Sequence, residues 1–178
     1  MEYGMKLIQG KNINLRAARV ADAEFIIGLR LQQHKTKYFS PVEDDLDKQR
    51  DWLEKYQEKE RKGLEYYFVI ESKLSEKLGL VRVYDLQPDS FFWESWLIKD
   101  DALKTTAIES APLAYEFWFG ELSYKQAYCD LRKGNDRVIA FHQRFGAKVT
   151  REDELNYYFI YKIDDYLTVK QKYKRYLN

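Results

Sequence analysis

Six stretches of the chain carry the alternation, or the β-branched and aromatic composition, that is typical of β-strands. They lie at residues 13–17, 65–71, 78–86, 91–98, 126–131 and 156–163. A polar turn separates the second stretch from the third, so these two predict a hairpin. In the fourth stretch, regular alternation predicts that four side chains share one face: Phe92, Glu94, Trp96 and Ile98.

Apolar residues at helical spacing predict helices at 22–33 and 108–119. Another helix, which is highly charged, ends near Glu60. Its start has two candidate patterns, Ser-Pro-Val-Glu at 40–43 or, slightly later, Asp-Asp at 44–45.

The order of these elements is strand, two helices, an antiparallel run of strands, and then alternating strands and helices. This order predicts an α+β (mixed α/β) fold around one sheet. We find no internal repeat and no linker, so residues 1–178 form one predicted domain. Its core is expected at about 12–163, followed by a basic, amphipathic tail at 164–178 that is expected to be helical.

Composition narrows the classes of partner. The formal net charge of +1 gives no reason to expect nucleic acid. Cys129 is the only cysteine, which rules out an intrachain disulfide and a cysteine-based zinc site, and the two histidines have no metal-site spacing. The chain has no apolar run of 18 residues and no signal-peptide core, so we expect a cytoplasmic protein with no membrane partner, as a monomer or homodimer.

A helix predicted at 135–146 carries the most information. Asn135 can cap it with its side-chain oxygen, and Gly146 can end it in a left-handed conformation. Between these two residues, four side chains recur at helical spacing and share one face: Val138, Phe141, His142 and Phe145.

Residues 135–147, Asn-Asp-Arg-Val-Ile-Ala-Phe-His-Gln-Arg-Phe-Gly-Ala, resemble the second signature of the GNAT family of acetyl-CoA-dependent N-acetyltransferases. His142 stands where the family often has Tyr, and Ala147 replaces a Phe. The resemblance covers roughly residues 12–163. It implies a mostly antiparallel sheet that splays open between the strands at 91–98 and 126–131, with acetyl-CoA in the cleft as co-substrate. The matched positions are Asn135, Val138, Phe141, Arg144 and Gly146.

In the family, the strand before the cleft leads into a glycine-rich loop that opens a helix and binds pyrophosphate. The corresponding residues 102–107 match only at the final alanine, and Pro112 should kink the helix or delay its start. Two interpretations stay open. Either this junction binds no cofactor, or its backbone amides, hydroxyls and ammonium hold the pyrophosphate through Lys104, Thr105, Thr106, Ala107 and Ile108.

Acetyl transfer requires a neutral amine, a polarised carbonyl and a protonated leaving thiolate. The resemblance assigns the second task to a backbone amide of Trp96, Leu97 or Ile98. It places His142 where the proton donor to the thiolate stands, and a histidine can donate near neutral pH. The alternative is that His142 is an ordinary residue of the core.

Glu94 is the candidate base, because it lies mid-strand among aromatic residues, where an unpaired carboxylate is costly. The alternative is a glutamate on the outer face of the sheet. Asn135 corresponds to a family contact with the pantetheine arm of the cofactor, and it can also serve only as a helix cap.

The opening segment is similar to the branch of the family that acetylates protein N-termini, amino sugars and related amines. Residues 35–42, with Tyr38 and Phe39, would wall the acceptor side. We expect direct transfer, in a ternary complex, to a primary amine of a small molecule, with an amino sugar as one candidate. The alternatives are a protein N-terminal acetyltransferase, a non-catalytic relative in which Trp96 and Tyr128 fill the cleft, and an unrelated domain that mimics the signature.

Overall fold

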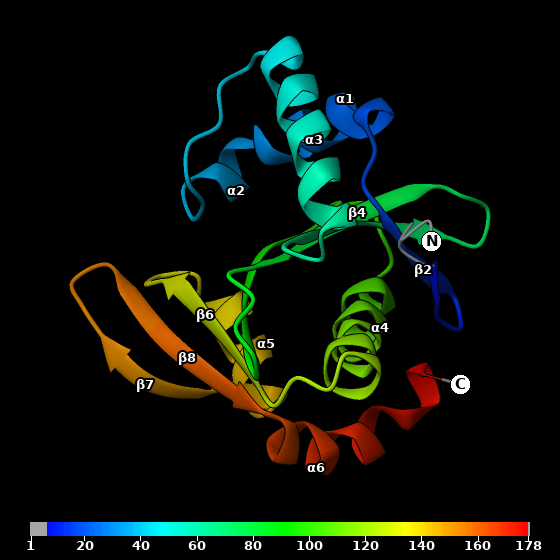
Figure 1. Cartoon of the computed structure of the whole chain (residues 1–178). Coiled ribbons are helices and arrows are strands. Elements are labelled where there is room, and N and C mark those ends of the chain that lie inside the picture. The colour runs from blue at the N-terminus through cyan, green and yellow to red at the C-terminus, as the bar shows by residue number, and fades with distance from the viewer. Residues whose placement is uncertain (1–6, 178) are drawn as a thin grey trace.

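One sheet of eight strands organises the protein (Figure 1). The computed structural model describes residues 7–177, apart from the side chains of Gln33 and Thr36. The strands follow the spatial order β1-β2-β3-β4-β5-β6-β8-β7. Their bounds are β1 (Ile8–Gln9), β2 (Ile13–Ala17), β3 (Tyr66–Ser72), β4 (Lys77–Tyr84), β5 (Ser90–Ile98), β6 (Gln126–Arg132), β7 (Lys148–Glu152) and β8 (Asn156–Lys162).

Neighbouring strands are antiparallel except for β5 and β6, which run parallel. These two strands pair only at their first residues, where Phe92 faces Tyr128, and then separate. The prediction of a mostly antiparallel sheet that splays open between these two strands is therefore confirmed.

Helices cover both faces of the sheet and form two cores (Figure 1). One face carries α1 (Ala23–Arg30) and α3 (Leu46–Arg61), with the short α2 (Gln33–Thr36) between them in the chain. The other face carries α4 (Lys104–Tyr115), a π-helical extension (Glu116–Glu121), α5 (Asp136–Arg144) and α6 (Ile163–Tyr173). The larger core is rich in aromatic residues and includes Cys129, as expected for a core residue; burial raises the pKa of this thiol to about 12.

Of the two starts considered for the charged helix α3, the later one is confirmed: Asp45 caps the helix by accepting a hydrogen bond from the Lys48 amide at 3.0 Å. The predicted start of the next long helix is wrong. Helix α4 begins at Lys104, four residues before the predicted 108, and includes Pro112 in its last turn. A proline at this depth lacks one amide donor but does not delay the start.

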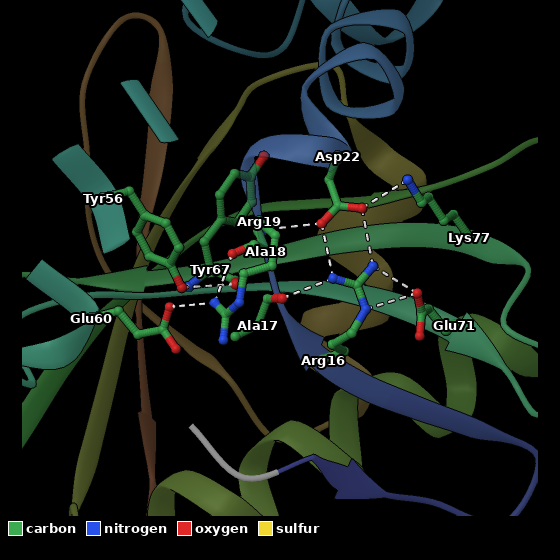
Figure 2. Close-up of polar contacts among 10 residues, drawn as sticks. All are labelled: Arg16, Ala17, Ala18, Arg19, Asp22, Tyr56, Glu60, Tyr67, Glu71 and Lys77. Atoms are coloured by element: carbon green, nitrogen blue, oxygen red, sulfur yellow. Dashed lines mark hydrogen bonds and ion pairs between the residues drawn. The ribbon is translucent and has the colours of Figure 1, made fainter. Parts of the chain in front are cut away.

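A network of buried charges holds the start of α1 on the sheet (Figure 2). Asp22 is 2% exposed and forms two hydrogen bonds with the Arg16 guanidinium, at 2.9 and 3.0 Å. Lys77 and the Arg19 amide complete its shell, both at 2.8 Å, and Glu71 holds Arg16 from the other side. Burial alone would raise the pKa of Asp22, but the hydrogen bonds from Arg16 and Lys77 outweigh it and lower that pKa to about 2.

Candidate active site

The separation of β5 from β6 leaves a cleft that opens at the edge of both strands. A cavity of about 290 Å³ lies there. It is lined by β5, β6, α5 and the segment after α2, with Glu94, Trp96, Asp130, Asn135, His142 and Tyr38 among its residues. Beyond Phe92, the edge of β5 that faces the cleft has no strand partner, so its backbone groups are available to a ligand, apart from the Ile98 carbonyl, which accepts from Lys35 Nζ at 2.8 Å.

A β-bulge shapes the β5 wall of the cleft. Leu80 of β4 faces Leu97, whereas Arg82 faces Glu94, so one residue of β4 lies opposite both Ser95 and Trp96. Ser95 adopts a left-handed φ of 52°, which is unusual for a residue other than glycine. The bulge therefore bends β5 at the point where it leaves β6.

The bulge also reverses the alternation of side chains, so the predicted shared face is wrong. Trp96 points to the α4 and α5 side, where its indole Nε1 donates to the Ser110 hydroxyl at 3.2 Å. Glu94 lies on the opposite side with Arg82, whose guanidinium packs over the ring of Trp52 on α3. An extra residue in one strand shifts every later side chain to the other face.

Two carboxylates flank the mouth of the cleft, one on each strand. Glu94 on β5 has a 32% exposed side chain and a long contact, 3.4 Å, with Arg82 Nη1. Asp130 lies on β6 and lines the same cavity, and burial raises its pKa above the ordinary value. Our sequence reasoning missed Asp130, because alternation shows only which face it occupies and not that the splay sets it across from Glu94.

His142 lies at the floor of the cleft on α5, which brings it to the cavity predicted from the family signature. Its ring is 3% exposed and packs edge-on against Trp96 and Trp93, at centroid distances of 5.8 and 6.3 Å. Burial lowers its pKa to about 4. The imidazole is therefore neutral near pH 7, so it offers one N–H donor and little imidazolium.

Trp96 narrows the cleft without filling it. Its ring lies 4.4 Å from that of Phe141, centroid to centroid, and so links β5 to α5. Tyr128, the other side chain considered as a plug, is 38% exposed and borders a different cavity on the outer face of the sheet.

Asn135 begins α5 at the predicted place, but its side chain makes no capping hydrogen bond. Only its carbonyl serves the helix, by accepting from the amides of Val138 and Ile139, both at 3.0 Å. The expected side-chain cap is therefore wrong, and the free amide group lines the cavity instead.

The predicted phosphate residues form the first turns of α4, beyond the end of β5. Lys104 and Thr105 are exposed, while Thr106 is 4% exposed. Within residues 7–177, the amides of Lys104 and Thr105 have no recorded acceptor, as is usual at a helix N-terminus. Residues 104–108 do not line the 290 Å³ cavity, so the structure brings Trp96, Asn135 and His142 together but leaves the α4 turn at a separate, solvent-facing position.

The segment after α2 forms one wall of the cleft. Tyr38 and Phe39 line the cavity, and the Tyr38 hydroxyl donates to the Gly134 carbonyl at 3.1 Å. Lys35 anchors α2 by donating from Nζ to the Ile98 carbonyl at 2.8 Å. The N-terminal helices thus reach across from β5 to the loop before α5.

Within residues 7–177, no three side chains of His, Cys, Asp or Glu are grouped so that they could hold a metal ion. In the same range, none of the helices has both the length and the apolar character needed to cross a membrane.

A family model described as "Acetyltransferase (GNAT) domain" matches residues 12–148. Among solved structures, the chain is similar to apo FdhC, described as a nucleotide-linked sugar GNAT. The two share 36% identity with a TM-score of 0.88, over 97% of this chain and 99% of that chain. A comparison with curated protein sequences gave no match.

More distant structures share the fold alone. One is spermidine N-acetyltransferase from Vibrio cholerae in complex with CoA and spermine, at 18% identity and a TM-score of 0.75, over 88% of this chain and 98% of that chain. Another is ribosomal-protein-S5-alanine acetyltransferase from Vibrio fischeri, at 13% identity and a TM-score of 0.77, over 90% and 98%.

Proposed function

Because the chain belongs to the GNAT acetyltransferase family, we propose that it transfers an acetyl group from acetyl-CoA to a primary amine of a small molecule, an amino sugar. The observation that carries this proposal is the cleft between β5 and β6, which has free backbone groups on one wall and a carboxylate at each side of its mouth. The description of FdhC as a nucleotide-linked sugar GNAT supports the sugar as acceptor.

Three groups of residues suit acetyl-CoA, which supplies an acetyl group activated as a thioester. The edge of β5 at Trp96, Leu97 and Ile98 has no strand partner and offers backbone groups, other than the Ile98 carbonyl, to the amides of the pantetheine arm. The side chain of Asn135 is not used for capping and can bind the same arm. The start of α4, residues 104–108, with Lys104 and Thr105 exposed, offers its amides and the Lys104 ammonium to the pyrophosphate, which the helix dipole also favours.

The acceptor amine must lose a proton before it can attack, and the carboxylates at the mouth of the cleft can take it. Asp130 has the raised pKa that brings a carboxylate closer to the working pH of a general base. Glu94, held only loosely by Arg82, can orient the ammonium from the other strand. We therefore assign Glu94 and Asp130 together to binding and deprotonating the amine.

His142 acts in this proposal as a neutral hydrogen-bond donor. With a pKa of about 4, the imidazole is almost entirely uncharged at pH 7. Its ring N–H can stabilise negative charge that develops in the cleft, and a backbone amide beside the Ser95 bulge can polarise the carbonyl of the acetyl group.

The test is a calorimetric titration with acetyl-CoA, followed by acetylation assays on a panel of amino sugars, polyamines and peptides with free N-termini. We expect micromolar binding and acetylation of an amino sugar. Glu94→Gln and Asp130→Asn should each lower kcat at pH 7 by about 10-fold to 100-fold, and Asp89→Asn, in the loop before β5, should leave it unchanged.

Two results would contradict the proposal. No binding at millimolar acetyl-CoA would favour a non-catalytic relative, a function supported by the glycine-free junction before α4 and by the contact between Trp96 and Phe141. Acetylation of peptide N-termini alone would instead identify a protein acetyltransferase.

A further inference from the structure

A second cavity lies on the outer face of the sheet, next to the cleft. Its volume is about 380 Å³, and it is lined by the loop between β4 and β5 and by side chains of β5, β6, β7 and β8. Tyr128 borders this cavity and Asp130, two residues along β6, borders the cleft. Alternate residues of a strand share one face, so Tyr128 and Asp130 lie on the same side of β6, and the residues that line the two cavities are neighbours along β5 and β6.

Aromatic rings form the floor of this second cavity. Phe92 and Tyr128 are paired neighbours on β5 and β6, and Tyr158 lies on β8 opposite Asp130. Tyr128 is 38% exposed and stacks on no other aromatic ring within residues 7–177, whereas Tyr158 is covered by the Arg151 guanidinium at 3.7 Å. The open ring is therefore that of Tyr128, and an exposed tyrosine face is suited to stacking against a flat heteroaromatic ring.

Two arginines stand beside these rings without a carboxylate partner. Arg132 lines the cleft and Arg151 lines the second cavity, and neither forms an ion pair within residues 7–177. Asp130 lies near Arg132, Asp153 lies near Arg151, and Asp85 also lines the second cavity. Other cations of this region are already paired: Lys133 with Glu152 at 2.9 Å, and Arg82 with Glu65 at 2.6 Å. A planar guanidinium that is not held in an ion pair can bind a phosphate group through two N–H donors at once.

We propose that this surface is a nucleotide-binding subsite for the acceptor. It takes a nucleoside diphosphate whose base stacks on Tyr128 beside Phe92 and whose diphosphate binds Arg151 and Arg132. The sugar attached to the diphosphate then extends past Asp130 into the cleft. This inference rests on the proposed function, because it requires that an amino sugar reacts in that cleft, and it adds that the sugar is recognised through a nucleotide that it carries.

The direct test is calorimetry with uridine diphosphate and thymidine diphosphate, with inorganic pyrophosphate as the probe that lacks a base. Each titration is run with saturating CoA present, so that the nucleotide cannot bind at the cofactor site. We expect both nucleotides to bind at least 10-fold more tightly than pyrophosphate. Tyr128→Ala should remove most of that difference, since stacking on an aromatic side chain accounts for about a 10-fold gain or more, and Tyr128→Phe should restore it.

Arg151→Gln should weaken the nucleotides and pyrophosphate by the same factor, because it removes a phosphate contact and no base contact. Leu74→Ala, an exposed residue of the turn between β3 and β4, is the matched surface control and should change nothing. Equal affinity for nucleotide and pyrophosphate, or unchanged nucleotide binding in Tyr128→Ala, would overturn the inference. So would a concentration-dependent dimer that Tyr128→Ala dissociates, since a second copy would then cover this face.

Failure of the proposed function would look different. Acetyl-CoA binding is measured in the same variants, and the Tyr128 and Arg151 substitutions should not alter it. If acetyl-CoA binds and free amino sugars are acetylated as fast as nucleotide-linked ones, then the transferase function is supported and the nucleotide subsite is contradicted. If nucleotides bind as expected but acetyl-CoA does not, then this surface binds nucleotides but the proposed transferase function is wrong.

Discussion

Polar side chains are paired differently in two parts of the sheet, the part under α1 and α3 and the cleft between β5 and β6. Under α1 and α3, every acid of the network around Arg16 is paired, and Arg19 extends it to Glu60 at 2.8 Å (Figure 2). In the cleft between β5 and β6, Asn135 makes no capping bond, and the indole nitrogen of Trp93 is buried without a partner among residues 7–177. The charged network around Arg16 holds elements together, whereas the cleft keeps these two polar groups available, although the Tyr67 hydroxyl under α3 is also buried without a partner in that range.

The physical reason lies in how strands β5 and β6 are paired. A buried charge is tolerated only when neighbouring elements supply partners, which β2, β3 and β4 do because they pair along their whole length. Strands β5 and β6 share only three residue pairs, so beyond them the facing edges of the two strands have no strand partner. Unsatisfied groups at such a place are a signature of a ligand site.

The largest effect is expected from breaking the paired half. Asp22→Ala leaves Arg16 and Lys77 without their shared acid and should lower the free energy of unfolding by about 4 kcal/mol, as measured by urea denaturation. Asp47→Ala, which removes an exposed ion pair with Arg50, should cost less than about 1 kcal/mol. Similar losses in the two variants would show that the buried network does not hold the fold.

Lowering the pH should destabilise the protein in two windows, one set by His142 in the cleft and a lower one set by Asp22 in the paired half. The pKa of His142 falls from 6.5 to about 4 on folding, so between these values only the unfolded chain binds the proton. Stability from this residue is therefore complete above pH 6.5 and is lost as the pH falls toward 4, by about 3 kcal/mol in total. Asp22 acts in a lower window: its contribution is complete above 3.8 and is lost as the pH falls toward 2.

The measurement is the free energy of unfolding from pH 8 to pH 2 in the parent and in His142→Phe. The variant should lose the dependence between 6.5 and 4 and keep the lower window. A profile that is unchanged in the variant would mean that His142 is not buried in neutral form.

A carboxylate placed at the first turn of α4 should prevent phosphate binding at the proposed site. We expect Thr105→Glu to weaken acetyl-CoA binding by more than about 100-fold, or about 2.7 kcal/mol, because it sets a negative charge against the pyrophosphate at the helix N-terminus. Calorimetry gives the affinity, and an unchanged melting temperature would show that the variant is folded. Lys55→Gln, on the exposed side of α3, makes the same change in net charge and should bind normally. Binding at parental strength in Thr105→Glu would place the phosphates elsewhere.

The smallest effect concerns the bulge. Ser95 and Ser75 both have a left-handed φ, 52° and 62°, but Ser95 lies in the cleft wall and Ser75 in a surface turn. Replacing either serine by glycine should relieve strain and stabilise the fold by about 1 kcal/mol. Only Ser95→Gly should also lower kcat, because the bulge loses rigidity beside the reacting carbonyl. Equal activity in both variants would show that the bulge geometry is not needed.

Local patterns were sufficient for much of the fold. The strands, the hairpin of β3 and β4, and helix α5 follow from periodicity within short windows. Gly146 ends α5 with φ 99°, as its position predicted. The start of α3 had two candidate caps, Ser40 and Asp45, and the structure shows that Asp45 is the one that accepts a first-turn amide.

The composition of the candidate site depended on contacts between residues that are distant in the sequence. Asp130 became a candidate only when the splay set it across the cleft from Glu94. His142 could be placed on the right helix face, but not assigned its low pKa, because desolvation depends on the tryptophans that surround it.

The sequence by itself determined the order of strands and helices, the family resemblance in residues 135–147 and the break in the glycine pattern before α4. These are properties of neighbouring residues, and they are encoded in spacing. Only the tertiary structure decided that Trp96 and Glu94 lie on opposite faces of β5 and that the Asn135 side chain is free. A bulge is a mismatch between two strands, and a cap competes with distant partners, so neither can be read from one segment alone.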